Sequence, residues 1–175
     1  MIWLWLLLII MVIFFGVVTL RGAPYLPSKK KYINQALREL YPLTTKDVLV
    51  DIGSGDGIVL REAAKLGARA IGYEINPVLV LVSRCLSRKN KRIEVRLVDF
   101  WLTHLPNGTT IVYVFSIQRD MKKIMKWMQN ETNRLNRPIY LMSFGFELGD
   151  MEPIKNVGAY NLYMFHSLQS GEAQV

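Results

Sequence analysis

The sequence predicts an α/β protein with a doubly wound, mostly parallel sheet, preceded by one N-terminal transmembrane helix. From residue 47 onward, short apolar strand-like segments alternate with helix-like segments, as they do where helical crossovers join parallel strands. The first of these strands runs into a turn with alternating glycines, which is typical of ligand-binding turns in such sheets. The transmembrane helix is predicted from an uncharged apolar run at the start of the chain.

The apolar run covers residues 1–20 and contains no Asp, Glu, Lys or Arg. About twenty apolar residues are enough to cross the hydrocarbon core of a bilayer as a helix. A cleaved signal peptide would have a basic start and a shorter apolar stretch, so a retained membrane anchor is favoured. Because Arg21 and the lysines at 29–31 follow directly, the positive-inside rule predicts a single-pass protein with its folded part on the cytoplasmic side.

Four parts are predicted along the chain. Residues 1–21 form the anchor, 22–45 a linker and a helix covering the ligand site, 46–170 the main α/β domain, and 171–175 a tail. The covering helix is expected over about 29–41, where apolar residues recur on one helical face. The single cysteine, Cys85, excludes a disulfide within the chain and a cysteine-based metal site, and no metal site is predicted.

The elements of the main domain follow in order. Strands are predicted over residues 47–53, 68–75, 93–100, 109–117, 138–146 and 160–168, with a short one near 153–157. Helices are predicted over 57–66, over about 76–89 and after Asp120. Asn76 and Asp120 are good helix caps, and Pro77 suits a first helical turn. The last helix has one apolar stripe, formed by Met121, Ile124, Met125, Met128 and Leu135.

The functional signal is the stretch Val48-Leu-Val-Asp-Ile-Gly-Ser-Gly-Asp-Gly57. Its three alternating glycines let the backbone approach a ligand closely and adopt positive φ. The helix that follows presents unpaired N–H groups to whatever binds in the turn. A dinucleotide-binding pattern needs glycine at position 58, where Ile58 stands, and the Gly-Lys-Ser/Thr of a phosphate-binding P-loop is absent. The loop therefore predicts another nucleotide-type ligand.

Acidic residues at the carboxyl ends of the predicted strands narrow the choice of ligand. Asp51, Glu74 and Asp99 lie at or near the ends of the first three strands, where parallel sheets bind ligands. Asp51 and Asp56 beside the loop would repel a phosphate group. They suit a ligand that carries positive charge, and S-adenosylmethionine carries an ammonium and a sulfonium. We therefore predict S-adenosylmethionine as the cofactor.

Roles within this site follow as hypotheses. The loop backbone would contact the amino-acid part of the cofactor, with Asp51 near its ammonium. Glu74 would accept hydrogen bonds from both ribose hydroxyls. Asp99 would accept one from the adenine amino group, with Phe100 or Trp101 packing on the ring. The predicted cofactor-binding residues are Asp51, Gly53, Ser54, Gly55, Asp56, Gly57, Glu74, Asp99 and Phe100.

These motifs resemble those of the class I (seven-strand) methyltransferases, which have a Rossmann-like fold. Four segments also resemble the small protein-lysine methyltransferases in particular: residues 23–28, 50–57, 72–77 and 98–101. That group includes mitochondrial enzymes that modify the adenine-nucleotide translocase and the ATP synthase c subunit, and an archaeal relative. The resemblance covers residues 23 to about 146. Relatives usually carry Arg where this chain has Ile58.

The resemblance implies an S-adenosylmethionine-dependent protein-lysine N-methyltransferase acting at the cytoplasmic face of a membrane. Its partners would be a protein substrate, which can be a membrane protein, and the membrane itself through residues 1–20. The candidate catalytic residues Tyr25, Trp101 and Ser116 would line an apolar slot around the acceptor lysine. Such a slot lowers the pKa of the lysine amine, so no obligatory base is expected.

Two alternatives stay open. The chain can be a methyltransferase for a lipid, a quinone or another small membrane substrate, or a non-catalytic module that binds the cofactor. The end of the fourth strand lacks the Asn/Asp-Pro-Pro-Tyr signature of enzymes that methylate base amines, so nucleic acid is not expected as a partner. A net charge of +8 suits an anionic membrane surface or an acidic partner. The acceptor and the oligomeric state are left open.

Overall fold

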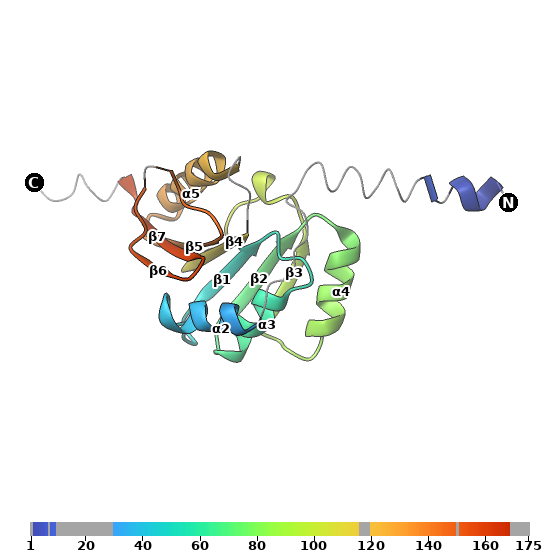
Figure 1. Ribbon diagram of the computed structural model, residues 1–175, viewed down its shortest axis with the longest axis horizontal. Coiled ribbons are helices and arrows are strands. Elements are labelled where there is room, and N and C mark those ends of the chain that lie inside the picture. Colours follow the sequence, from blue (N-terminus) through green and yellow to red (C-terminus); the bar gives the residue numbers. More distant parts are fainter. Residues whose placement is uncertain (1, 7, 10–29, 116–119, 150, 169–175) are drawn as a thin grey trace, which may run out of the picture.

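The computed structural model describes residues 2–6, 8–9, 30–115, 120–149 and 151–168 (Figure 1). Its centre is a seven-stranded sheet with the order β3-β2-β1-β4-β5-β7-β6. The strands are β1 (Val48–Ile52), β2 (Arg69–Glu74), β3 (Ile93–Leu97), β4 (Ile111–Phe115), β5 (Ile139–Phe144), β6 (Lys155–Val157) and β7 (Tyr160–Phe165). The helices are α2 (Lys30–Glu39), α3 (Ile58–Lys65), α4 (Pro77–Ser87), α5 (Met121–Leu135) and a short 3-10 turn, η1 (Phe100–Leu102).

The sheet is mostly parallel, which confirms the predicted α/β architecture. Strands β1 to β5 pair in parallel, with β1 between β2 and β4. β7 runs antiparallel to β5, and β6 runs antiparallel to β7. The chain therefore winds outward twice from β1, first to β3 and then to β5. The carboxyl ends of the first five strands meet at one edge of the sheet.

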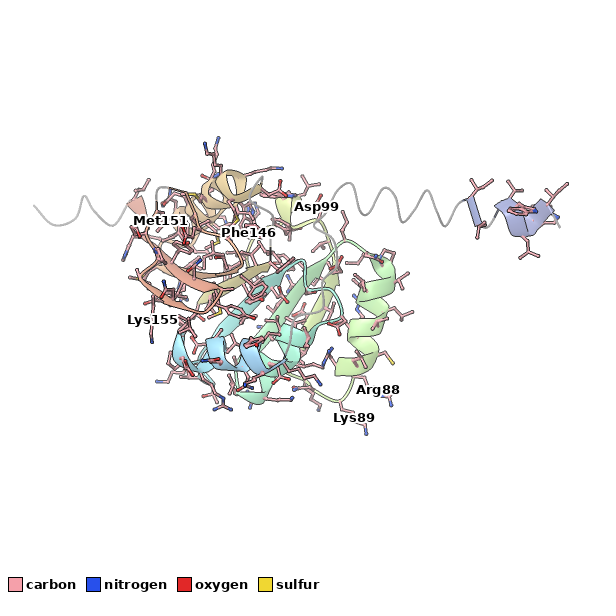
Figure 2. All side chains as sticks on the ribbon, viewed as in Figure 1. Arg88, Lys89, Asp99, Phe146, Met151 and Lys155 are labelled. Carbon is pink, nitrogen blue, oxygen red and sulfur yellow. The ribbon has the colours of Figure 1, made fainter. Side chains whose placement is uncertain are left out.

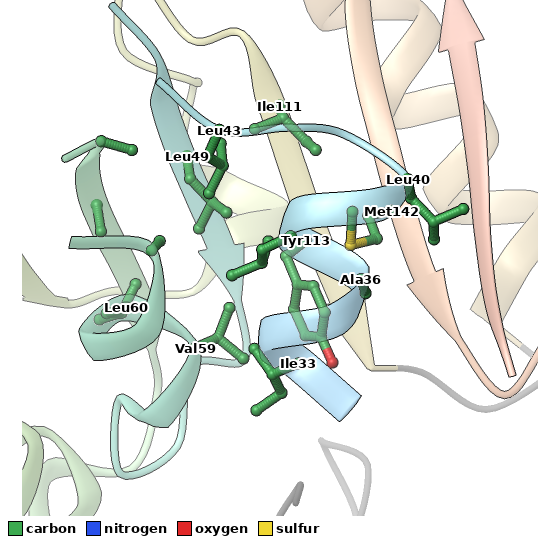
Figure 3. Close-up of a cluster of buried hydrophobic side chains, with 14 of the residues drawn as sticks. Ile33, Ala36, Leu40, Leu43, Leu49, Val59, Leu60, Ile111, Tyr113 and Met142 are labelled. Atoms are coloured by element: carbon green, nitrogen blue, oxygen red, sulfur yellow. The ribbon is translucent and has the colours of Figure 1, made fainter. Parts of the chain in front are cut away.

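The two faces of the sheet have separate apolar cores. On one face, apolar residues of α2, α3 and α4 pack against alternate strand positions, among them Ile33, Leu60 and Tyr113 (Figure 3). On the other face, α5 packs with its predicted apolar stripe inward, and Ile124 and Met128 are fully buried. Figure 1 shows α5 and the pair α2 and α3 on opposite sides of the sheet.

The third strand is shorter than predicted. β3 ends at Leu97, and residues 100–102 form η1 in place of the end of a strand. The cause is local, because the Asp99 carboxylate accepts a hydrogen bond from the Trp101 N–H at 3.0 Å and so caps the turn. The alternation of apolar residues in the sequence carries no information about this side-chain cap.

The predicted N-terminal transmembrane helix is wrong for the part of the chain that the structure describes. No helix there combines the length and the apolar character needed to cross a membrane. The described helical residues at the N-terminus are 2–6 and 8–9, whereas a span needs about twenty consecutive residues. Residues 10–20 of the predicted anchor lie outside the described residues.

Candidate cofactor site

The glycine loop follows β1 and lies against the end of β2. The backbone N–H groups of Gly53 and Ser54 both donate to the carbonyl oxygen of Tyr73, at 2.9 and 3.0 Å. Gly53, Gly55 and Gly57 all have positive φ, at 84°, 53° and 78°. Residues with a Cβ rarely adopt this backbone conformation, so the path of the loop requires glycine at these three positions.

The glycines of this region serve different purposes. A Cβ on Gly53 would meet nothing within 4 Å, so the space above the loop is open to a ligand. A Cβ on Gly57 would lie 2.1 Å from Ser83 Oγ, because Gly57 lets the start of α3 pack against α4. The sequence reasoning missed Gly72, whose Cβ would lie 2.5 Å from Ser54 Oγ and 2.7 Å from Leu60 Cδ1. A glycine inside an apolar strand was the available signal for this close approach.

Replacing Gly72 with alanine is expected to destabilise the protein by about 1–3 kcal/mol, the usual range for overpacking a buried site. The added methyl group must displace Ser54, and with it the loop, so binding of S-adenosylmethionine should weaken as well. Chemical denaturation and calorimetric titration measure the two effects. Gly108→Ala shows the cost of backbone strain without a close contact, because φ is +87° there and a Cβ meets nothing within 4 Å. Unchanged stability of Gly72→Ala would contradict the packing described above.

Glu74 fastens the loop to the end of β2. One carboxylate oxygen accepts from the Gly55 N–H at 2.8 Å, and the other accepts from the Asn76 N–H at 2.8 Å. Glu74 is buried, at 7% exposure. A carboxylate has about four lone-pair positions, so each oxygen can accept one further hydrogen bond. The predicted contact with ribose hydroxyls is therefore compatible with the bonds that Glu74 already makes.

Asp51 is the most deeply buried acid of the site, at 2% exposure. Burial, and then the charges of Glu74 and Asp56, raise the pKa of Asp51 well above its usual range. A carboxylate in this position gains from a nearby positive charge. This is the electrostatic setting that the predicted ammonium of the cofactor would meet.

Asp56 has partners within the chain. One carboxylate oxygen accepts from the Ile58 N–H at 3.1 Å, at the start of α3. The other lies 3.2 Å from the guanidinium of Arg61, one helical turn further along. Asp56 thus fixes the beginning of α3, while the Ile58 side chain packs against the core. Arg61 brings positive charge beside the loop even though position 58 has none.

Asp99, Phe100 and Trp101 lie together after β3, on the far side of Glu74 from the loop (Figure 2 labels Asp99). The Phe100 and Trp101 rings are 4.3 Å apart between centroids. Phe100 also contacts Trp127 of α5, at 5.7 Å, so it belongs to the core of that face. Trp101 carries the ammonium of Lys123 on its ring, at 3.9 Å from the centroid. Of the two aromatic residues, Trp101 is thus the one with a charged neighbour.

Two of the predicted slot residues, Tyr25 and Ser116, lie outside the described residues, so their roles stay predictions. Phe115 ends β4 and stacks on Phe144 of β5, with ring centroids 5.6 Å apart. Beyond these rings, at the same edge of the sheet, a depression of about 560 Å³ opens between the end of β5 and the β6–β7 turn. Its lining includes Phe146, Glu147, Gly158 and Asn161.

These residues fit the predicted cofactor. Glycine backbone with open space at Gly53, a buried acid whose charged neighbours are other acids, and a second acid with spare acceptor positions lie together at the ends of β1 and β2. In addition, Ser54 Oγ is buried without a hydrogen-bond partner among the described residues. Such orphaned polar groups are uncommon and call for an explanation. In the described part of the chain, no group of three His, Cys, Asp or Glu side chains is placed to hold a metal ion.

Comparison with known proteins assigns this chain to a family. The sequence model of the family described as ANTKMT methyltransferase domain matches residues 51–155, from the glycine loop to β6. The chain belongs to the ANTKMT methyltransferase family. The match confirms the predicted resemblance and the predicted class of enzyme, an S-adenosylmethionine-dependent methyltransferase. The individual roles assigned to the site residues are not tested by it.

Curated relatives of this ANTKMT family member include both protein and RNA methyltransferases. The ATP synthase c-subunit lysine N-methyltransferase of Xenopus laevis is 34% identical over 119 residues, which cover 66% of this chain and 51% of the relative. Ribosomal RNA small subunit methyltransferase A of Thermotoga petrophila is 40% identical over 89 residues, covering 49% and 34%. The chain thus spans about half the length of the lysine methyltransferase that it matches.

A solved structure supports the same fold. An RNA methyltransferase from Salinibacter ruber, in complex with S-adenosyl-L-homocysteine, matches with a TM-score of 0.70 and 28% identity. The match covers 80% of this chain and 92% of that protein. The class I methyltransferase fold predicted for this ANTKMT family member is therefore confirmed.

Proposed function

We propose that this chain is a protein-lysine N-methyltransferase that uses S-adenosylmethionine and acts at a membrane face. The observation that carries the cofactor assignment is the buried Asp51, whose pKa is raised by burial and by neighbouring acids, below an open glycine loop. The lysine acceptor is supported by relatives named as lysine N-methyltransferases. When bound, S-adenosylmethionine supplies an electrophilic methyl group.

The residues of this chain bind and orient. Asp51 compensates the ammonium of the cofactor, Glu74 accepts from its ribose, and the open face of Gly53 lets the backbone contact it. Positioning of this kind is the main requirement of a methyl transfer. The exposed carboxylate of Glu147 beside the depression at the end of β5 suits the approach of a positively charged side chain. Trp101, with Tyr25 and Ser116, remains the proposed lining of the slot.

A second acceptor class is favoured by one observation. Both the Thermotoga petrophila relative and the Salinibacter ruber structure are named as RNA methyltransferases. The sequence after β4, Phe115-Ser-Ile-Gln118, still lacks the Asn/Asp-Pro-Pro-Tyr signature of base-amine methylation. We therefore place protein lysine first, and RNA and lipid become outcomes of the same experiment.

The test is transfer of a radiolabelled methyl group from S-adenosylmethionine by the full chain. Purified ATP synthase c subunit is the first candidate acceptor, because relatives are named for it, and a membrane lysate is the second. Protein, lipid and RNA fractions are then separated. We expect label in protein and methyl-lysine after acid hydrolysis. Label confined to lipid or to RNA overturns the lysine assignment, and absence of both label and cofactor binding overturns the enzyme.

A matched pair of variants ties the label to the site. Asp51→Asn alters the proposed cofactor site and should remove the label. Glu94→Gln alters an acid of β3, which β2 separates from β1, and Glu94 pairs there with Arg69 and Arg96 at the surface. This variant should leave the label unchanged. Equal labelling by both variants would show that the methyl transfer does not depend on Asp51.

A further inference from the structure

Helix α4 carries an apolar face that no described part of the chain covers. Its inward residues, Val80, Ser83 and Ser87, are buried against the sheet. The opposite side is apolar as well, with Leu81 at 70% exposure and Leu86 at 57%. The spacing is i, i+3, i+4, i+7 and i+8, one continuous helical stripe. We name it the α4 apolar face: Val78, Leu81, Val82, Cys85 and Leu86.

Contiguous exposed apolar patches of this kind mark sites of interaction in soluble domains. The helix lies at the outer side of the domain, next to the edge strand β3 (Figure 1). Scattered apolar residues would need no explanation, but a stripe that runs the length of one helix does.

The charges along the α4 segment of the chain have one sign. Between residues 75 and 93 there are five basic residues and no acid. Arg84 turns its guanidinium toward the sheet and donates to the Val95 carbonyl at 2.7 Å. The other four follow the end of the helix, and Figure 2 shows two of them, Arg88 and Lys89, pointing away from the domain. We name these four the basic rim: Arg88, Lys89, Lys91 and Arg92.

None of the four residues of the basic rim makes an ion pair within the described part of the chain. Arg88 contacts only the sulfur of Cys85, at 3.9 Å, and Arg92 donates to the Gly67 carbonyl at 3.0 Å. The nearest acid along the chain, Glu94, is already paired with Arg69 and Arg96. The rim therefore offers positive charge to an outside partner.

We propose that the α4 apolar face and its basic rim dock on an anionic lipid surface. An interfacial helix inserts its apolar side into the headgroup boundary while basic residues bind anionic lipids. A second copy of the chain fits less well, because two rims would meet with no acid between them. The described N-terminal residues, 2–6 and 8–9, are apolar and carry no acid, so they offer nothing to the rim.

This docking specifies the surface through which the proposed enzyme would act at a membrane face, and it rests on that proposed function. It also explains how a domain whose described helices do not span a bilayer would stay at a membrane. Because Asn76 caps α4 and its N–H donates to Glu74, the first turn of the helix lies beside the cofactor site. Docking along α4 would thus hold the site at a fixed height above the lipid.

Cys85 provides the probe, because it is the only cysteine of the chain and is exposed within the α4 apolar face. The full chain is labelled there with an environment-sensitive fluorophore and mixed with phosphatidylcholine vesicles, with or without phosphatidylserine. We expect a blue shift and brighter emission only with phosphatidylserine, quenching by spin-labelled lipid, and reversal by salt. Methyl transfer plays no part in this readout, so its failure and a failure of the enzymatic proposal are distinguishable.

Two matched controls separate the face from the rest of the chain. In the variant Cys85→Ser with Lys126→Cys, the fluorophore is attached to an exposed position of α5 on the opposite face of the sheet. Its emission should not shift when vesicles are added. Arg88→Gln with Lys89→Gln should weaken vesicle affinity about 30-fold, since each basic residue near an anionic surface contributes about 1 kcal/mol. Lys122→Gln with Lys126→Gln removes the same charge from α5 and should leave affinity within about twofold.

Several results would overturn the docking. One is vesicle binding by pelleting with no change at the Cys85 probe, which places the contact elsewhere. Another is equal response to neutral vesicles, which removes the role of the basic rim. A probe already blue-shifted without vesicles would show that the face is covered, by another segment of the chain if concentration has no effect and by a second copy if it does. Absence of any response to phosphatidylserine also overturns it.

Discussion

Asp51→Asn should make the unliganded protein more stable while strongly weakening its binding of S-adenosylmethionine. The asparagine keeps the shape of the side chain and removes a buried charge that faces Glu74 and Asp56. We expect a gain of about 0.5–2 kcal/mol in the free energy of unfolding, the range of single stabilising changes at functional sites. Loss of a hydrogen bond to a charged group should weaken binding by about 1.5–3 kcal/mol, roughly 10- to 150-fold in Kd.

The stability gain should depend on pH in a defined direction. Because the pKa of Asp51 is raised in the folded state, ionisation costs more there than in the unfolded chain. This cost is absent below the usual pKa of 3.8, grows as pH rises from there to the raised value, and is constant above it. The difference in unfolding free energy between Asp51→Asn and the parent should therefore be small near pH 4 and largest at neutral pH.

Urea denaturation of both proteins at several pH values measures this difference, and calorimetric titration measures Kd. A difference that stays constant with pH would show that ionisation of Asp51 does not lower the stability of the folded protein. A less stable Asp51→Asn would show that its carboxylate has a stabilising partner. Unchanged binding would place the ammonium of the cofactor away from Asp51.

Glu74→Ala should weaken the same binding but with the opposite effect on stability. The substitution leaves the Gly55 and Asn76 N–H groups without their acceptor. A buried donor left unsatisfied costs about 1–3 kcal/mol, and two of them should lower the free energy of unfolding by roughly 2–6 kcal/mol. Removal of a negative charge beside Asp51 offsets part of this loss. The loop, released from β2, should no longer hold the cofactor.

Binding by Glu74→Ala is measured well below its melting temperature, so that a loss cannot come from unfolding. Glu94→Ala is the matched control, because Glu94 is an acid of the adjacent strand with surface ion pairs only. Such pairs contribute about 0–1 kcal/mol, and cofactor binding should be unaffected. If Asp51→Asn and Glu74→Ala both bind S-adenosylmethionine like the parent, the cofactor site lies elsewhere.

Much of the fold was predictable because its signals are local. Alternating apolar segments predicted β1 to β5 and their helices, and the stripe from Met121 to Leu135 predicted which side of α5 is buried. Proximity of Asp51 and Glu74 also followed, since the carboxyl ends of neighbouring parallel strands meet at one edge. The class of ligand that the loop binds could be predicted from the spacing of its glycines and from the acidic residues in the same stretch.

Other features depend on contacts between distant segments, which periodicity does not encode. The insertion of β7 between β5 and β6 depends on strand pairing, and the sequence shows only that strands exist there. The need for glycine at Gly72 comes from its contact with Ser54, across a turn. The hydrogen bond between Gly55 and Glu74 depends on how the folded chain places the Glu74 side chain. The same is true of the ion pair between Arg61 and Asp56. The transmembrane prediction relied on the length and apolar character of residues 1–20, and it is wrong for the described part of the chain, where no helix is long and apolar enough to span a membrane.

The place of β7 in the sheet has a consequence for synthesis on the ribosome. β5 (Ile139–Phe144) pairs with β4 on one side and with β7 on the other, and β7 ends only at Phe165. Until that residue has been translated, the nascent chain presents the apolar β5 with one row of N–H and C=O groups unpaired. Open edges of this kind pair readily with other chains. Ribosome stalling between β5 and β7 would therefore yield the most aggregation-prone form of this domain.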